Sequence, residues 1–131
     1  MQTRRWVNQS QPQTLVIGVF LLYFEAVSIV LGFLLYGRIG IFGLLLIGAH
    51  VAAGYGIANE RKWAWHLGIA LSVLALLPFL YRVLPFLPLP TLLRSFLSYF
   101  GGGLLALLFG GAQLALLVHP QSRDHGRIWF R

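Results

Sequence analysis

The sequence predicts an all-α integral membrane protein, a four-helix bundle, from its composition, its apolar stretches and the placement of its basic residues. Of the 131 residues, 58% are hydrophobic and only 10% are charged. An ordinary soluble domain carries about 25% charged residues, so this chain has too few charges to cover a surface that faces water. We therefore expect residues 1–131 to form a single membrane domain.

Four apolar stretches approach or exceed the length that crosses a bilayer, which is about 20 residues in a helix. The predicted helices cover residues 15–36, 39–58, 67–84 and 92–118. A very short turn at Gly37 and Arg38 joins the first two, which predicts an antiparallel hairpin. Polar tails at residues 1–14 and 119–131 flank the helices.

The connection between the third and fourth predicted helices is rich in proline and yet apolar. Pro85, Pro88 and Pro90 cannot continue a helix, because proline has no amide hydrogen to donate. Nearly every other residue there is apolar, so the segment should lie in the outer membrane interface and not in water. Residues 91–100 either form a helix on that surface or lead directly into the fourth span.

The basic residues sort by loop and predict the orientation in the membrane. Three fall in the first and third loops (Arg38, Arg82, Arg94), and seven fall in the two tails and the second loop (Arg4, Arg5, Arg61, Lys62, Arg123, Arg127, Arg131). Cytoplasmic loops carry the excess of Lys and Arg, so both termini are predicted to be cytoplasmic, in a bacterial inner membrane. Membrane lipid, and not nucleic acid, is the expected partner of the net charge of +7.

Glu25 is the most unusual residue of the first predicted helix, because an unpaired carboxylate is expensive in hydrocarbon. In an antiparallel hairpin around Gly37, residues at equal depth have numbers that add to about 75, so Glu25 faces His50. Both lie about 18 Å from the turn, near the middle of the bilayer. The sequence therefore predicts an intramembrane polar pair.

Small residues accompany this pair along the predicted interface between the first two helices. Gly18, Ser28 and Gly32 share the stripe of Glu25, whereas Gly43 and Gly54 share that of His50. Small residues let two helix backbones approach closely in lipid. We interpret these five positions as a close-packing seam.

Two hypotheses for the pair remain open. In the first, Glu25 and His50 relay a proton or bind a cationic substrate, since histidine can change its charge near neutral pH. In the second, they hydrogen-bond to each other and fix the register of the hairpin or an oligomer contact.

The fourth predicted helix carries small residues beyond those that one small bundle needs. They are Gly102, Gly103, Ala106, Gly110, Gly111 and Ala115. Such a face favours packing against another membrane protein chain or a second copy of this one. The leading functional prediction is therefore a non-enzymatic accessory subunit of a membrane complex or a homo-oligomer, and the alternative is a small proton-coupled transporter or channel using Glu25 and His50.

Other classes of function are disfavoured by what the sequence lacks. There is no cysteine, which excludes disulfides, thiolate metal sites and thiol catalysis. No nucleophile, base and orienting residue come together, so we expect no enzyme activity. We also expect no cofactor and no metal.

Two resemblances can be stated on particular residues. The stretch ERKWAWHLGIALSVLALL resembles a turn and helix found in small four-helix bacterial inner-membrane proteins, in which an interfacial arginine and tryptophan introduce the third helix. Four helices with one glutamate, Glu25, in the first helix are similar in layout to the small multidrug resistance transporters. That resemblance implies exchange of protons for cationic drugs at Glu25. The glycine and aromatic pattern of those transporters is absent from the second and third helices here.

Overall fold

The computed structural model of the chain describes residues 3–38, 40–83, 88, 90, 91 and 104–131. The described residues form five α-helices and no strand, which confirms the all-α prediction for this part of the chain. The helices are α1 (Gln13–Tyr36), α2 (Ile41–Ala58), α3 (Lys62–Val83), α5 (Leu104–Val118) and α6 (Pro120–Trp129).

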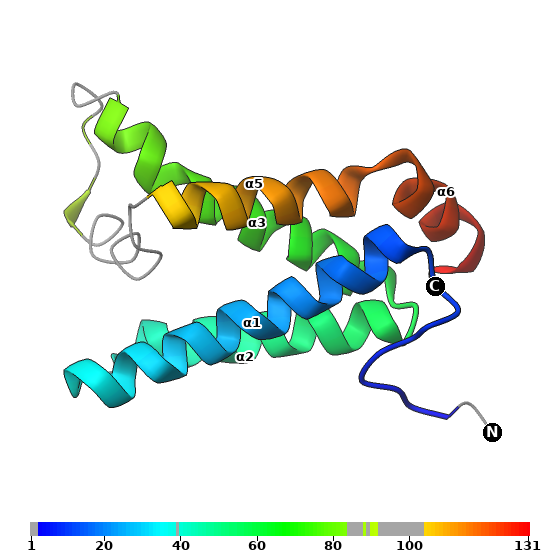
Figure 1. Ribbon diagram of the computed structural model, residues 1–131, viewed down its shortest axis with the longest axis horizontal. Helices are drawn as coiled ribbons and strands as arrows, with labels where there is room; N and C mark the ends of the chain where they lie inside the picture. The colour runs from blue at the N-terminus through cyan, green and yellow to red at the C-terminus, as the bar shows by residue number, and fades with distance from the viewer. Residues whose placement is uncertain (1–2, 39, 84–87, 89, 92–103) are drawn as a thin grey trace.

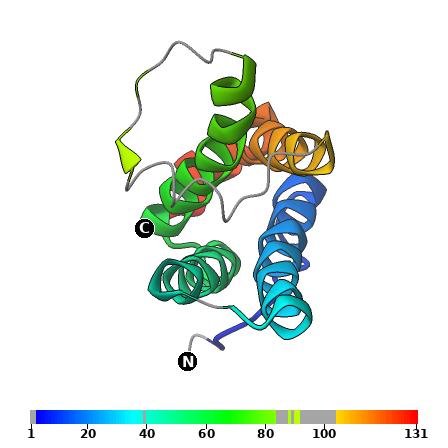
Figure 2. The ribbon, with the colours of Figure 1, turned by 90° about the vertical axis from the view of Figure 1, so that its left-hand side faces the viewer.

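The four long helices are arranged as a ring of neighbours (Figures 1 and 2). Helix α1 packs against α2 and α5, and α3 packs against the same two helices. The short helix α6 turns back across one end of the bundle, where it contacts α5 and α1. The N-terminal segment and the α2–α3 turn lie at this same end, so both chain termini and one turn meet there.

The hairpin of α1 and α2 forms as the sequence predicts. Its helices begin within two residues of the predicted starts at 15 and 39. Gly37 ends α1 with a left-handed φ of 67°, and its amide donates to the carbonyl oxygen of Phe33 at 2.8 Å. Glycine is the favoured residue for this helix end because it lacks the Cβ atom that strains other residues there.

The turn between α2 and α3 closes with two backbone hydrogen bonds of the Schellman type. Arg61 donates to the carbonyl oxygen of Gly56 at 2.8 Å, and Glu60 donates to that of Ile57 at 3.0 Å. This motif needs a left-handed residue, which is usually glycine. Here Glu60 takes that position with φ 60°, so a non-glycine residue carries the conformational strain.

Two boundaries correct the sequence prediction. Helix α3 begins at Lys62 and not at residue 67, because the polar and aromatic residues before Leu67 continue its first turn. The tail predicted at 119–131 contains α6, which starts with Pro120. Proline suits a first helical turn, and the His119 side chain accepts a hydrogen bond from the amide of Gln121. The start of the predicted helix 92–118 and most of the proline-rich loop lie outside the described residues.

The most deeply buried side chains gather between the middle of the bundle and the end that carries α6. Leu15, Leu22, Ile57, Ala64 and Leu117 each have 0% of their surface exposed. These residues come from all four long helices. They join the helices near the end at which the termini meet.

Candidate functional site

Glu25 and His50 occupy different environments. His50 is buried at 2% exposure, and its Nδ1 atom lies 2.7 Å from the carbonyl oxygen of Leu46, to which it donates as the Nδ1–H tautomer. Glu25 is half-buried. No hydrogen bond or ion pair among the described residues joins Glu25 to His50. The ion pair in the described part of the chain connects His125 with Glu60, at another place in the fold. Among the described residues, the predicted pair is therefore not joined by a hydrogen bond or an ion pair.

The rotation of α1 explains this outcome. A Cβ atom on Gly18 would lie 3.1 Å from Cδ2 of Leu117, so the Gly18 side of α1 faces α5. Glu25 lies seven residues further along, on the same stripe. Tyr23, on another side of α1, faces α2 and lies against Gly54. The short turn constrains the depth of the two helices, but it does not fix which side of α1 faces α2.

A buried polar layer crosses the bundle at the middle of the helices. We define it by His50, Ser72 and Gln113, which are 2%, 1% and 2% exposed and come from α2, α3 and α5. Gly68 of α3 approaches Leu117 of α5, and Gly110 of α5 approaches Ala75 of α3. These two contacts place Ser72 and Gln113 at about the same level. Ser72 donates to the carbonyl oxygen of Gly68 at 2.8 Å.

Glu25 lies beside this polar layer on the fourth side of the ring. The neighbouring Phe24 packs on Phe109 of α5, with ring centroids 5.2 Å apart. Glu25 is therefore level with the Gly110 region, about one helical turn from Gln113. All four long helices thus place a polar side chain near one depth.

The predicted close-packing seam is divided between two interfaces. Gly18 packs on α5, and Gly54 packs on the ring of Tyr23. Gly43 is buried, whereas a Cβ atom on Gly32 would have no other atom within 4 Å. The Ser28 hydroxyl donates to Phe24 of its own helix at 2.8 Å. Gly32 and Ser28 thus do not join α1 to α2, which corrects the single seam expected from the sequence.

The predicted partner face of the fourth helix is also divided. A Cβ atom on Gly110 would lie 3.2 Å from Cβ of Ala75, so Gly110 packs inside the chain, which corrects its assignment to an outward face. A Cβ atom on Gly111 would have no other atom within 4 Å, and Ala115 is exposed. Gly102 and Gly103 lie outside the described residues, and of Ala106 only the backbone, in α5, is described.

We call the end of the bundle that contains both termini and the α2–α3 turn the basic end. Three segments meet there (Figure 1), and together they contain seven basic residues: Arg4, Arg5, Arg61, Lys62, Arg123, Arg127 and Arg131. Arg38 lies at the opposite end, after α1. The fold therefore concentrates positive charge at one end.

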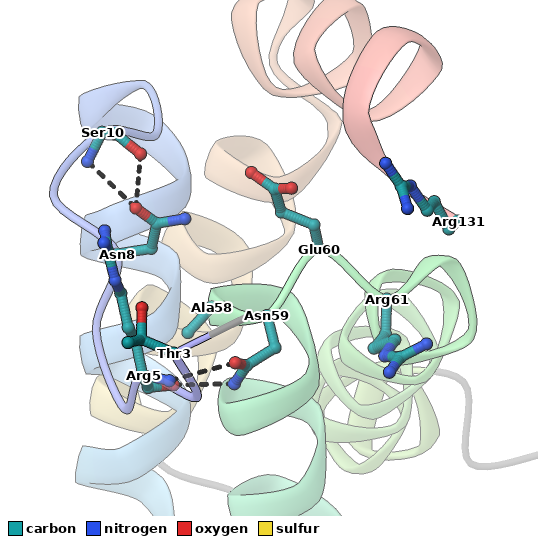
Figure 3. Close-up of a pocket in the computed structure, with 9 residues that line it drawn as sticks. All are labelled: Thr3, Arg5, Asn8, Ser10, Ala58, Asn59, Glu60, Arg61 and Arg131. Carbon is teal, nitrogen blue, oxygen red and sulfur yellow. Dashed lines mark hydrogen bonds between the residues drawn. The ribbon is translucent and has the colours of Figure 1, made fainter. Parts of the chain in front are cut away.

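The N-terminal segment is fastened to the basic end by side-chain hydrogen bonds. Asn59 accepts from the Arg5 amide at 3.0 Å and donates to the Arg5 carbonyl oxygen at 2.7 Å (Figure 3). Tyr23 donates to the Trp6 carbonyl oxygen at 2.8 Å, and Gln11 donates to that of Ile57 at 2.7 Å. These bonds connect residues far apart in the sequence, so the segment is part of the fold.

The C-terminal segment is joined to the same turn through its backbone. Arg131 donates to the carbonyl oxygen of Glu60 at 3.0 Å and accepts from the Lys62 amide at 2.9 Å. The Ser122 hydroxyl is fully buried, donates to the Leu116 carbonyl oxygen at 2.7 Å and lies 2.7 Å from the Thr14 hydroxyl. Helix α6 is therefore connected to α1, α3 and α5.

A polar pocket of about 270 Å³ opens where these segments meet (Figure 3). Its lining includes Arg5, Asn8, Ser10, Glu60, Arg61 and Arg131. Glu60 is the one acid among the residues that line it. Three arginines and one glutamate among the lining residues make this end of the molecule positive, which favours an anion over a cation as the group that binds there.

His125 lies close to this pocket, on α6. Its Nε2 atom is 3.8 Å from Oε1 of Glu60, which is too long for a hydrogen bond, and this buried nitrogen has no hydrogen-bond partner. Burial lowers the pKa of His125, and the Glu60 carboxylate opposes this effect only in part. The imidazole is therefore held toward its neutral form.

Sequence reasoning missed the residues that fasten the two termini to the α2–α3 turn. A signal was present in Asn59, since asparagine directly after an apolar helix is typical of a helix end. Nothing in the sequence indicates that its partner is Arg5. Within the described part of the chain, no group of three or more His, Cys, Asp or Glu residues is arranged to hold a metal ion.

The described fold and site define an all-α protein in which two helices, α1 and α2, are long and apolar enough to cross a membrane. The apolar parts of α3 and α5 in the described residues are shorter, spanning Lys62–Pro78 and Leu107–Val118. Comparisons with protein-family models, with curated proteins and with solved structures found no match.

Proposed function

We propose that the chain is a multi-pass protein of the bacterial inner membrane that spans the bilayer four times. The exposed apolar surface supports this proposal. In the most apolar windows of α1 and α2, only 28% and 44% of the residues are buried inside the chain. Phe20, Leu34 and Leu35 are 55%, 68% and 77% exposed, although the core helix of a soluble protein would cover such side chains.

The basic end supports an orientation with both termini in the cytoplasm. Its seven basic residues belong to three segments that meet at one end of the bundle, and an excess of Lys and Arg marks the cytoplasmic side. Trp63 and Trp129 are each 55% exposed and lie at this end, as expected for rings at the level of the lipid headgroups.

Within the membrane, the chain acts as a non-enzymatic subunit that packs against another membrane protein or a second copy of itself. The outward face of α5 at Gly111 and Ala115 carries this proposal. These two small residues are four positions apart, and the chain leaves the space beside Gly111 empty. This spacing lets a second helix approach closely, which is how helices associate in lipid.

Substitution of Gly111 by leucine tests this subunit role. A photo-crosslinking residue at Leu108, which is 58% exposed near Gly111, should capture a partner chain in native membranes. Gly111→Leu should abolish the crosslink but keep the monomer inserted, because nothing in the chain occupies that space. Ala70→Leu is the control, since Ala70 is an exposed small residue on another helix. Unchanged crosslinking in Gly111→Leu would contradict the proposal.

The polar layer supports a second candidate, a small proton-coupled transporter or channel. His50, Ser72 and Gln113 are buried in the middle of the bundle, and Glu25 lies beside them on α1. Polar side chains in the middle of a membrane bundle often mark the route of an ion or a substrate.

Proteoliposomes loaded with a pH-sensitive dye test this candidate. If the chain conducts or exchanges protons, Glu25→Gln should abolish the flux, because glutamine keeps the shape but cannot carry a proton. Ser28→Ala on the same helix should keep it, since Ser28 bonds only within α1. Absence of flux in the wild-type chain would contradict transport, and the crosslink would still test the subunit role.

A further inference from the structure

Two neighbouring hollows lie along α2, beside the N-terminal segment. The first has a volume of about 330 Å³ and is lined by Gly48, Val51 and Ala52, with Tyr55, Trp6 and Arg4 at its end. The second has a volume of about 400 Å³ and is lined by Tyr55, Gly56, Asn59, Arg61, Trp63 and Arg4. Because Arg4 and Tyr55 line both hollows, the two adjoin each other. We call the two hollows together the α2 groove.

The two parts of the α2 groove differ in chemistry. At Gly48 and Ala52 the lining is apolar, and a Cβ atom on Gly48 would have no other atom within 4 Å. At the basic end the lining is polar and contains Arg4 and Arg61 but no acid. From Gly48 to Asn59 the helix rises about 16 Å, so the groove runs from the apolar middle of α2 to the basic end.

Neither arginine of the polar part forms an ion pair with another described residue. The ion pair among the described residues joins His125 and Glu60, and it includes neither Arg4 nor Arg61. Both arginines are exposed. Trp6, which lines the apolar hollow, packs on Tyr55 with ring centroids 5.0 Å apart, and Tyr55 lines both hollows.

We propose that the α2 groove binds one anionic phospholipid, with the phosphate at Arg4 and Arg61 and an acyl chain over Gly48 and Ala52. The charge at one end and the apolar surface at the other match the two parts of such a lipid. The aromatic side chains of Trp6 and Tyr55 suit the glycerol region, which lies between the phosphate and the acyl chains of the lipid. This inference rests on the proposed membrane location and adds a specific lipid to it.

Native mass spectrometry of the purified chain in mild detergent tests the site. Phosphatidylglycerol and phosphatidylcholine with identical acyl chains are added in turn, and the bound lipid is counted. We expect one phosphatidylglycerol to be retained in preference to phosphatidylcholine. In Arg4→Gln/Arg61→Gln, its retention should fall by roughly 25-fold, since each interfacial basic residue contributes about a factor of five.

A control variant separates this site from the general charge of the basic end. Arg123→Gln/Arg127→Gln removes the same charge from exposed positions on α6 that line neither hollow, and should retain the lipid. Equal loss in both double variants, or equal retention of the two lipids by the wild type, would overturn the inference.

Two further measurements identify the source of the phosphate. Gly48→Leu should fill the apolar part and weaken lipid retention without changing any charge. Inorganic phosphate at millimolar concentration should not displace the lipid, and displacement would assign the groove to a soluble anion instead. Incorporation into nanodiscs is scored separately, so failure to insert would contradict the membrane proposal, whereas insertion without lipid selectivity would contradict only the lipid site.

Discussion

The basic end of the bundle and the opposite end, at the α1–α2 turn, differ in how deeply their described apolar side chains are buried. On α1, Leu15 and Leu22 are fully buried toward the basic end. Toward the opposite end, Leu34, Leu35 and Tyr36 are 68%, 77% and 80% exposed. The buried residues of α1 therefore end at Ala26, and the rest of the helix has none.

The hydrogen bonds follow the same division. At the basic end, Asn59, Gln11 and Ser122 connect segments that are distant in the sequence. At the opposite end, the turn is closed by the local bond from Gly37 to Phe33. The comparison indicates that packing and long-range hydrogen bonds among the described residues stabilise the basic end more than the opposite end.

Substitution of a glycine at each end should give the largest contrast. A Cβ atom at Gly56 would collide with Cβ of Ala64, so Gly56→Ala should force α2 and α3 apart and cost about 3 kcal/mol. Gly32→Ala, in open space on α1, should be neutral or gain about 0.5 kcal/mol from its helix propensity. Thermal unfolding in detergent measures both changes, and equal melting temperatures for the two variants would contradict the division.

Removal of the Asn59 side chain should release the N-terminal segment. Asn59→Ala loses the two hydrogen bonds to Arg5 and one to Tyr55, at a cost of about 2 kcal/mol. Hydrogen exchange should then increase in residues 3–11 and remain unchanged around Gly37. Ser28→Ala is the control, because its bond lies within α1. Protection of residues 3–11 as in the wild type would show that Asn59 does not hold them.

The two left-handed helix ends should respond in opposite directions to substitution. Glu60→Gly removes strain at φ 60° and should gain up to about 1 kcal/mol. Gly37→Ala introduces strain at φ 67° and should lose a similar amount. Unfolding midpoints compare the two. A loss in Glu60→Gly would mean that the Glu60 side chain contributes more than its backbone strain costs.

The smallest expected effect is a pH dependence confined to the basic end. Burial lowers the pKa of His125 in the folded chain, so the unfolded chain binds more protons as the pH falls through about 6.5. Stability should therefore decrease from pH 7 to pH 5 and be constant above about pH 7. In His125→Gln this dependence should weaken, whereas in His66→Gln, at an exposed histidine, it should persist. The same dependence in both variants would exclude His125 as its source.

Local sequence signals predicted most of the helices but not the contacts between distant segments. Apolar length and Gly37 located α1 and α2 within two residues at their starts. The missed helix α6 is too polar to be recognised by apolar length, although Pro120 suits the first turn of a helix. The early start of α3 has the same cause, since Lys62 and His66 interrupt the apolar pattern.

The predicted site was less accessible to sequence reasoning, because rotation of a helix about its axis is a tertiary property. The hairpin turn constrained the depth of Glu25 and His50, but Gly18 directs the Glu25 stripe toward α5. Similarly, the sequence groups Gly110 with Gly111, and only the packing on Ala75 separates an inward glycine from an outward one.

The orientation of the two ends across a membrane tests the central claim most directly. The chain has no cysteine, so single cysteines at the exposed positions Thr3, Tyr36 and Gln121 report their own location without changing a basic residue. With a membrane-impermeant maleimide on intact spheroplasts, Tyr36→Cys should be labelled at once, and Thr3→Cys and Gln121→Cys only after lysis. Labelling of Gln121→Cys in intact spheroplasts, or equal labelling at all three positions, would contradict an orientation with the basic end in the cytoplasm and the α1–α2 turn on the outer side of the membrane.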